Sequence, residues 1–289
     1  MTARQTLLLI RGLGHSGSTI LDLALGAHPQ VIGLGEAARV LARPKPGEEQ
    51  RGPAMLRGSH RDKRRCTCGA IASDCPVWGP MLSWLVAHDE HPLAEKMQQL
   101  LTLTSAHGAE SALQPEVIVD SFQDDLLLPR LMPPDVDVRV IHLVRDVRSW
   151  LHSRLKASRQ TRLLFPDLRT LVRWWYVNRK FDRVLQQCGR PVFRLGYEEL
   201  ALNPERSLQL LCAWLGLPFD RQMLTPGASS TSHILSGNRM RFDQERTRMI
   251  CYDGSWLTSA EMMVRLAMLI PPVSRLNQRL VYSNQIVLR

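Results

Sequence analysis

Residues 7–36 read LLLIRGLGHSGSTILDLALGAHPQVIGLGE and contain the first strand, turn and helix that the sequence predicts. Leu7–Ile10 is a run of four apolar residues, which is typical of a short buried strand. Gly12–Thr19 is a glycine-rich turn, and the apolar residues of Ile20–Leu25 favour a helix after it. Because a strand, a glycine turn and a helix place backbone N–H groups and a positive helix end around an anion, we expect this corner to bind a phosphate.

The spacing of the turn resembles the P-loop pattern G-x-x-x-x-G-K-[ST], with one departure. Gly12, Gly17 and Thr19 stand at the expected positions, but Ser18 replaces the lysine. That lysine reaches the β- and γ-phosphates of a nucleotide, so its absence argues against triphosphate hydrolysis. A loop that binds a terminal phosphate without splitting a triphosphate fits better, and an ordinary strand–turn–helix corner is the simpler alternative.

A second anion-binding pattern begins where the strand predicted at Val138–Val144 ends. Arg145 and Ser153 stand eight residues apart with a helix between them, and Asp146 could cap that helix. A guanidinium forks onto phosphate oxygens, and a hydroxyl two helical turns later adds a donor. A capped helix with surface arginines would be the preferred interpretation if this pattern stood alone.

The two patterns together resemble the donor site of sulfotransferases. H-S-G-S-T at His15–Thr19 is similar to the 5′-phosphosulfate loop [KR]-S-G-T-[TS], and Arg145–Ser153 is similar to the 3′-phosphate motif R-D-x-R-x-x-x-x-S. The layout down to Gly35-Glu36 resembles most closely that of tyrosylprotein sulfotransferases and their bacterial relatives. The resemblance implies 3′-phosphoadenosine 5′-phosphosulfate (PAPS) as the donor and adenosine 3′,5′-bisphosphate (PAP) as the product, with no metal required.

The resemblance also implies which residues would hold the donor. Tyr197 belongs to a Y-E-x-L segment whose tyrosine lies near the adenine in the family. Arg239 and Arg241 belong to a G-N-x-x-R segment, and the sequence does not choose between them for a 3′-phosphate contact. The full set of cofactor-binding candidates is Gly14, His15, Ser16, Gly17, Ser18, Thr19, Arg145, Ser153, Tyr197, Arg239 and Arg241.

Glu36 and His15 are the candidate catalytic residues. The acceptor hydroxyl must lose its proton as it attacks, and the resemblance makes Glu36 the general base. The loop's basic residue assists the leaving phosphate in the family, and His15, which replaces Arg or Lys, would do so best as imidazolium. Asp120 and His142 are the other candidates for the base, and a carboxylate at a helix start is the simpler role for Glu36.

Alternating strands and helices predict an α/β fold. It would be a P-loop-like, three-layer fold with a mostly parallel central sheet flanked by helices, forming a single sulfotransferase-like domain over residues 1–289. The strands are expected at Leu7–Ile10, Val117–Ser121, Val138–Val144 and Pro191–Leu195, and the helices at 20–25, 37–41, 80–108, 166–185 and 206–215. A polar insert at 43–65 is expected to be mobile and close to the mouth of the active site.

Composition restricts the choice of partner. The formal charge is +10, the pI is about 9.8, and 44% of the 289 residues are hydrophobic, as expected of a globular protein with an anionic ligand. The basic residues are spread along the chain, which favours a cofactor pocket over a nucleic-acid tail. No window approaches 18 apolar residues, so we expect a cytoplasmic protein without a membrane span.

The acceptor is left open by the sequence, as is the oligomeric state. A small hydroxylated metabolite, a lipid or a peptide fits equally well. Two alternatives from other classes also remain: a P-loop kinase or NTPase, and a non-catalytic binder of nucleotide or nucleic acid.

A cysteine-containing loop is expected at 66–78. Cys66, Cys68 and Cys75 could be three zinc ligands, with His60 as a candidate for the fourth, or a disulfide pair with one spare thiol. A folded-back loop packed on Trp78 is the simplest interpretation. The remaining three cysteines, expected to be plain core thiols, are Cys188, Cys212 and Cys251.

Overall fold

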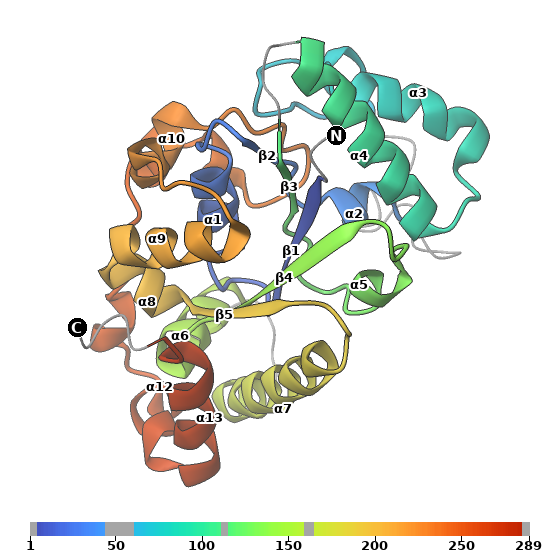
Figure 1. Cartoon of the computed structure of the whole chain (residues 1–289). Coiled ribbons are helices and arrows are strands. Elements are labelled where there is room, and N and C mark those ends of the chain that lie inside the picture. The colour runs from blue at the N-terminus through green and yellow to red at the C-terminus, as the bar shows by residue number, and fades with distance from the viewer. Residues whose placement is uncertain (1–4, 44–60, 111–114, 159–164, 285–289) are drawn as a thin grey trace.

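A five-stranded sheet lies at the centre of the computed structural model, which describes residues 5–43, 61–110, 115–158 and 165–284 (Figure 1). Its strands are β1 (Thr6–Gly12), β2 (Val31–Gly33), β3 (Val117–Asp120), β4 (Asp137–Val144) and β5 (Val192–Gly196), in the order β2-β3-β1-β4-β5. Every pairing in the sheet is parallel. The predicted α/β fold with a parallel sheet is therefore confirmed.

Helices cover both faces of this sheet because its central strands are apolar on both sides. Leu7 and Leu9 of β1 pack on one face, against α2, α3, α4 and α7, whereas Leu8 and Ile10 pack on the other, against α1, α8 and α9. A third apolar cluster joins α6, α7, α12 and α13. In Figure 1, α3 and α4 lie together on one side of the molecule, and α12 and α13 form the opposite side.

The longer helices follow the strands as the sequence predicted, but some details differ. Pro80–Gly108 is divided between two helices that are separated before Leu93, and Val31–Gly33 forms a strand too short to show periodicity. The helices are α1 (Ser18–Leu25), α2 (Ala37–Leu41), α3 (Trp78–His88), α4 (Leu93–Glu110), α5 (Leu128–Leu131), α6 (Val147–Ser158), α7 (Pro166–Gln186), α8 (Tyr197–Leu202), α9 (Pro204–Leu215), α10 (Pro226–Ser229), α11 (Gln244–Thr247), α12 (Met262–Leu266) and α13 (Pro271–Val281). The 3₁₀ helices are η2 (Ala72–Asp74), η3 (Arg221–Leu224), η4 (Arg239–Phe242), η5 (Ser255–Thr258) and η6 (Ala267–Leu269).

The expectations for the polar insert, the remaining cysteines and a membrane span can also be compared with the structure. Most of the insert predicted at 43–65 lies outside the described residues, as does His60. Cys188 and Cys212 are buried as expected, but Cys251 is exposed, which corrects its assignment to the core. Among the described helices, none combines the length and hydrophobicity that crossing a lipid bilayer requires.

Candidate active site

The carboxyl ends of the parallel strands lie at one edge of the sheet, and this edge gathers predicted site residues. In sheet order, Glu36 follows β2, Ser121 follows β3, the loop Gly12–Thr19 follows β1, Arg145 follows β4, and Tyr197 follows β5. Ligands of open α/β sheets bind outside these ends, at the point where the strand order reverses. Because the chain places β2 and β3 on one side of β1 and then β4 and β5 on the other, the glycine loop after β1 lies at that reversal point.

The glycine loop has a conformation that suits an anion. His15 and Gly17 have positive φ angles of 73° and 91°, and α1 begins directly after them. Among the hydrogen bonds of the described residues, none is donated by the backbone N–H groups of residues 17–19. These donors and the positive end of α1 are therefore available to a ligand. A Cβ atom added to Gly17 would lie 2.5 Å from Cδ2 of Tyr197, so this position requires glycine.

Side chains from distant segments fix the carbonyl groups of this loop. Trp150 of α6 donates from Nε1 to the Gly14 oxygen at 2.8 Å, and Arg145 donates from Nη1 to the His15 oxygen at 3.2 Å. Gln123, which follows β3, donates from Nε2 to Oγ of Ser18. The loop is thus held from β3 on one side and from α6 on the other, before any ligand binds.

His15 contacts two side chains of α6. Its Nδ1 lies 3.4 Å from Oγ of Ser153, and its Nε2 lies 3.2 Å from Nη1 of Arg154. Partial burial of the ring lowers the pKa of His15, and the positive charges of Arg154 and Arg145 lower it further. The lowered pKa favours a neutral His15 in the ligand-free protein, and its role as an imidazolium with the donor bound stays a prediction. Arg154, which the sequence analysis missed, is the permanent cation at this point.

Arg145 is buried, and each nitrogen of its guanidinium has a partner. Nε donates to Oγ of Ser149 at 2.7 Å, Nη2 pairs with Asp253 at 2.8 Å, and the guanidinium carbon lies 4.7 Å from the centre of the Tyr197 ring. Trp174 fixes the backbone by donating from Nε1 to the Arg145 oxygen at 3.1 Å. Asp253 thus occupies Nη2 of Arg145, a donor that a phosphate would use. The sequence around Asp253 did not indicate this ion pair.

Glu36 begins α2 and keeps one carboxylate oxygen unoccupied. Its Oε2 accepts from Arg39 and, at 3.0 Å, from Oγ of Ser236. The backbone also joins the two segments, because the Glu36 N–H donates to the Ser236 oxygen at 2.9 Å. Within the described residues, Oε1 has no hydrogen-bond partner, so it is the atom that could accept a proton.

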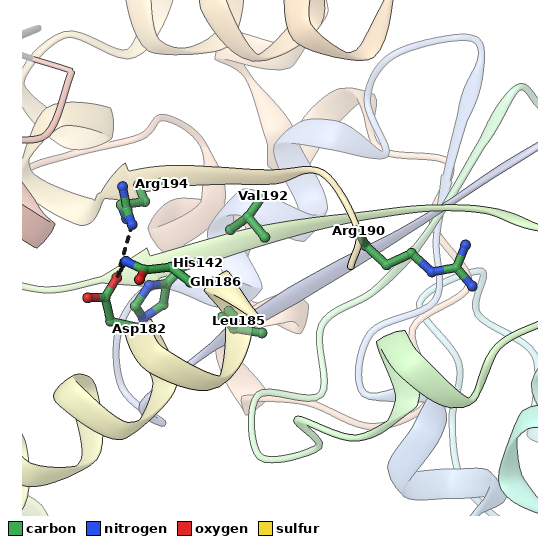
Figure 2. A pocket seen from close by; sticks show the side chains of 7 residues that line it. All are labelled: His142, Asp182, Leu185, Gln186, Arg190, Val192 and Arg194. Carbon is green, nitrogen blue, oxygen red and sulfur yellow. Dashed lines mark hydrogen bonds and ion pairs between the residues drawn. The ribbon is translucent and has the colours of Figure 1, made fainter. Parts of the chain in front are cut away.

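The two alternative bases are buried away from solvent. Asp120 is fully buried, with Oδ2 paired to Arg11 at 2.9 Å and Oδ1 accepting from the Ala38 N–H at 2.9 Å. His142 lies inside β4, and burial lowers its pKa to about 4, so it is neutral. Figure 2 shows His142 beside Asp182. Both residues line a cavity of about 250 Å³ between β4, β5 and α7. The side chain of Arg190 extends away from His142 in the same view.

Arg239 and Arg241 lie on η4, three and five residues after Ser236, rather than beside Arg145. Arg241 donates to three carbonyl groups of its own loop, those of Leu235, Gly237 and Asn238. Arg239 is exposed. Within the described part of the chain, neither arginine makes a hydrogen bond or an ion pair with Arg145 or Ser153, so a shared 3′-phosphate contact stays a prediction.

Asp22 and Glu198 are two buried carboxyl groups that the sequence analysis missed. Asp22 lies in α1 against Gly33, and neither of its oxygens has a hydrogen bond of good geometry within the described residues, although the Ser121 side chain and the Gly35 backbone are close enough to oppose part of the pKa shift. Burial, reinforced by the nearby charge of Asp120, raises its pKa to about 7. Glu198 accepts from the Asp146 N–H at 2.8 Å, and burial together with the charge of Asp146 raises its pKa to about 8. A lone acid within the apolar run LDLAL was the available signal for Asp22.

Comparisons with known proteins point to one family. A model described as "Sulfotransferase family" matches residues 126–221, which include Arg145, Ser153 and Tyr197. "Protein-tyrosine sulfotransferase 2" of Gallus gallus is 26% identical over 250 residues, covering 79% of this chain and 57% of that protein. "Protein-tyrosine sulfotransferase 1" of Danio rerio is 25% identical over 226 residues, covering 75% of this chain and 55% of that protein.

The chain therefore spans just over half the length of these curated relatives. A solved structure, the sulfotransferase domain from the Synechococcus PCC 7002 olefin synthase, superposes with a TM-score of 0.51 at 17% identity. The match covers 96% of this chain and 95% of that one, and it shows the shared fold. Together the family match, the curated relatives and the fold support the assignment of this chain to the sulfotransferase family.

Proposed function

We propose that this chain transfers a sulfuryl group from PAPS to a hydroxyl group of an acceptor. The observation that carries the proposal is the meeting of the two phosphate patterns: Arg145 and Ser153 both contact His15, at its backbone oxygen and its ring. Two anion-binding elements that adjoin in this way suit a ligand with two separate phosphate groups. We also propose that the chain forms one domain, because each of its three apolar clusters contains residues of the same sheet.

The donor would bind along the carboxyl edge of the sheet. The free N–H groups of residues 17–19 would hold the 5′-phosphosulfate at the start of α1. Arg145 and Ser153 would hold the 3′-phosphate, and Asp253 would then have to release Nη2 of Arg145. Tyr197, whose hydroxyl donates to the Cys251 oxygen at 3.0 Å, would form one wall of the nucleotide site.

The chemical step needs a base and a stabilised leaving group. The acceptor oxygen forms a bond to sulfur while the bond between sulfur and the bridging phosphate oxygen breaks. Glu36 would take the acceptor's proton at Oε1, and the leaving PAP would keep the electron pair of the broken bond. Arg154 and the loop N–H groups would stabilise the negative charge on that oxygen, with His15 as an added donor.

The surroundings of Glu36 support an acceptor that carries negative charge. Arg39 pairs with Glu36 directly. The charge of Arg241 interacts with both Glu36 and Arg64. The curated relatives are named for protein tyrosine, so a tyrosine peptide with acidic neighbours is the first acceptor to test, beside neutral phenols and lipids.

Calorimetric titration with PAP tests the donor site, with ATP as the control ligand. We expect micromolar binding of PAP, weak binding of ATP, and at least a tenfold loss for Arg145→Ala, since a charged hydrogen bond contributes about 1.5–3 kcal/mol. Arg221→Ala is the matched control, because the side chain of Arg221 is 85% exposed and lies outside the proposed site. Tight binding of ATP with slow Mg²⁺-dependent turnover would favour a P-loop NTPase instead.

A further inference from the structure

Three cysteines and a histidine converge beside the segment that holds Glu36. One ligand atom from each of Cys66, Cys68, Cys75 and His233 lies within 4.8 Å of all the others. Sγ of Cys75 is 3.7 Å from Sγ of Cys66 and 3.3 Å from Nδ1 of His233. The histidine is 158 positions from Cys75 in sequence, so the fold alone brings the fourth side chain to this cluster.

We propose that these four side chains bind one Zn²⁺ ion in a closed Cys₃His site. Structural zinc sites have four sulfur or nitrogen ligands in a tetrahedron, with bonds of about 2.3 Å to sulfur and about 2.0 Å to nitrogen. Ligand atoms on such a tetrahedron are separated by roughly 3.5 to 3.8 Å. The separations of Cys75 from Cys66 and from His233 are near these values, and the set of soft ligands selects zinc over magnesium or calcium.

Hydrogen bonds assemble the site independently of the ion. The turn after Cys66 closes through two backbone bonds, from the Cys66 N–H to the Ala70 oxygen at 2.9 Å and from the Gly69 N–H to the Cys66 oxygen at 3.1 Å. Trp78 donates from Nε1 to the His233 oxygen at 2.6 Å. Thr67 accepts from the Ile234 N–H at 2.8 Å, which joins the two ligand-bearing segments. The ligands are therefore positioned before metal binding, so little of the binding free energy is needed to order them.

A positively charged side chain lies beside the cluster and could offset the negative charge of a zinc centre. Three thiolates, a neutral imidazole and Zn²⁺ carry a net charge of −1, which is costly to bury unless a cation is close. Arg241 is half-buried beside the cluster, and its charge interacts with Cys66. Its Nε lacks a hydrogen-bond partner within the described residues. A cation is thus already in place beside the ligands.

The zinc site would be structural and would stabilise the catalytic edge. Four protein ligands leave no open coordination position for water or substrate, so no step of the reaction uses the ion. His233 lies three residues before Ser236, which bonds Glu36 through both its backbone oxygen and its hydroxyl. Loss of the ion would therefore loosen the segment that holds the proposed base.

Metal analysis of the full chain tests the site directly. After removal of any purification tag, protein prepared with a reductant and Zn²⁺ should contain one zinc ion per chain. Cys66→Ser, Cys75→Ser and His233→Ala should each lose it. Cys188→Ser and Cys212→Ser are matched controls, because both thiols are buried and lie outside the cluster, and they should retain one ion.

Two further measurements keep the test decisive if a cysteine variant fails to fold. Wild-type protein loaded with Co²⁺ should show the thiolate charge-transfer and tetrahedral d–d absorption bands. His233→Cys should recover the zinc that His233→Ala loses. The proposal is overturned if folded wild type binds neither metal, or if zinc remains in His233→Ala and both cysteine variants. A Cys66–Cys75 disulfide in protein kept under reductant would also overturn it. None of these results depends on sulfuryl transfer.

Discussion

At the scale of single residues, the environment of His15 changes the role that its position suggests. Loops of this kind usually carry Arg or Lys, whereas His15 is held neutral between Ser153 and Arg154. The permanent positive charge at this point belongs to Arg154 of α6. A bound phosphosulfate would oppose the lowering of the His15 pKa, because negative charge favours the imidazolium.

We therefore predict a pH dependence of PAP binding that the variant His15→Arg removes. The free protein holds His15 at a lowered pKa and bound phosphate raises that pKa, so wild type should gain affinity as the pH falls through the pKa of the complex, and the gain should level off below the pKa of the free protein. Titrations of wild type and His15→Arg from pH 8 to pH 5 measure this. Protonation of the ligand affects both proteins equally, so the ratio of their affinities isolates His15. A ratio that stays constant over this range would contradict the prediction.

Asp253 should weaken donor binding because its carboxylate occupies Arg145. Asp253→Asn removes a negative charge beside the proposed 3′-phosphate position and weakens the hold on Nη2 of Arg145, because only a neutral amide oxygen then remains to accept. We expect PAP to bind about fivefold more tightly, equivalent to about 1 kcal/mol for a pair with one partly exposed partner. Calorimetry with Asp243→Asn as the control measures the change. Weaker binding in Asp253→Asn would show that Asp253 positions Arg145 instead of competing with the phosphate.

Glu36→Gln should slow transfer strongly while leaving the donor site intact. The amide cannot accept the proton of the acceptor, and loss of a general base typically costs 10²- to 10⁴-fold in rate. PAP release from PAPS, measured with an acceptor that supports turnover, reports the rate, and calorimetry reports PAP binding. Retained turnover in a variant that binds PAP normally would remove Glu36 from the mechanism.

At the scale of elements, the junction of β1 and α1 depends on a glycine for two reasons. Gly17 has a φ angle of 91°, and the Tyr197 ring at the start of α8 leaves no room for a Cβ atom. The junction is thus packed against the strand-to-helix turn of β5. Gly17 therefore packs the glycine loop against Tyr197, the residue that we propose lines the nucleotide site.

Gly17→Ala should accordingly disrupt the loop more than an ordinary left-handed glycine would. We expect a loss of about 2 to 3 kcal/mol in the free energy of unfolding and at least a tenfold loss in PAP affinity. Gly216→Ala is the control, because Gly216 has a φ angle of 82° and no neighbouring atom within 4 Å of an added Cβ. Equal losses of stability in the two variants, with PAP binding retained, would show that contact with Tyr197 is unimportant.

At the scale of the whole molecule, buried acids make stability depend on pH. The folded pKa of Asp22 is about 7 and its model-peptide value is 3.8, so the folded protein holds a proton that the unfolded chain has lost. Stability from this group is present at low pH, falls as the pH rises from about 4 to about 7, and is constant above that. Glu198 acts in the same direction.

Asp22→Asn should therefore be more stable than wild type at pH 8 and gain nothing at pH 4. At pH 8, removal of the buried charge should raise the free energy of unfolding by up to about 4 kcal/mol, given this pKa shift. The amide N–H groups of the new Asn would lack partners, which should lower the free energy of unfolding by about 1 to 3 kcal/mol. Denaturant unfolding at the two pH values gives the difference. If Asp22→Asn is destabilised by the same amount at both pH values, its carboxyl is not the group that titrates.

The sequence by itself determined the α/β fold and the positions of both phosphate patterns. It could do so because the apolar run of β1, the glycine turn and the Arg145–Ser153 spacing are local features, and parallel pairing places the ends of such units at one edge. The strand β2 escaped prediction because three residues cannot show a period.

Contacts between distant segments were decided only by the tertiary structure. Asp253 pairs with Arg145 across 108 positions, Arg154 lies beside His15 across 139, and His233 reaches Cys75 across 158. The lowered pKa of His15 and the raised pKa of Asp22 follow from such packing. No periodicity or spacing encodes these contacts, because burial and proximity of charge depend on which surfaces the folded sheet and helices bring together.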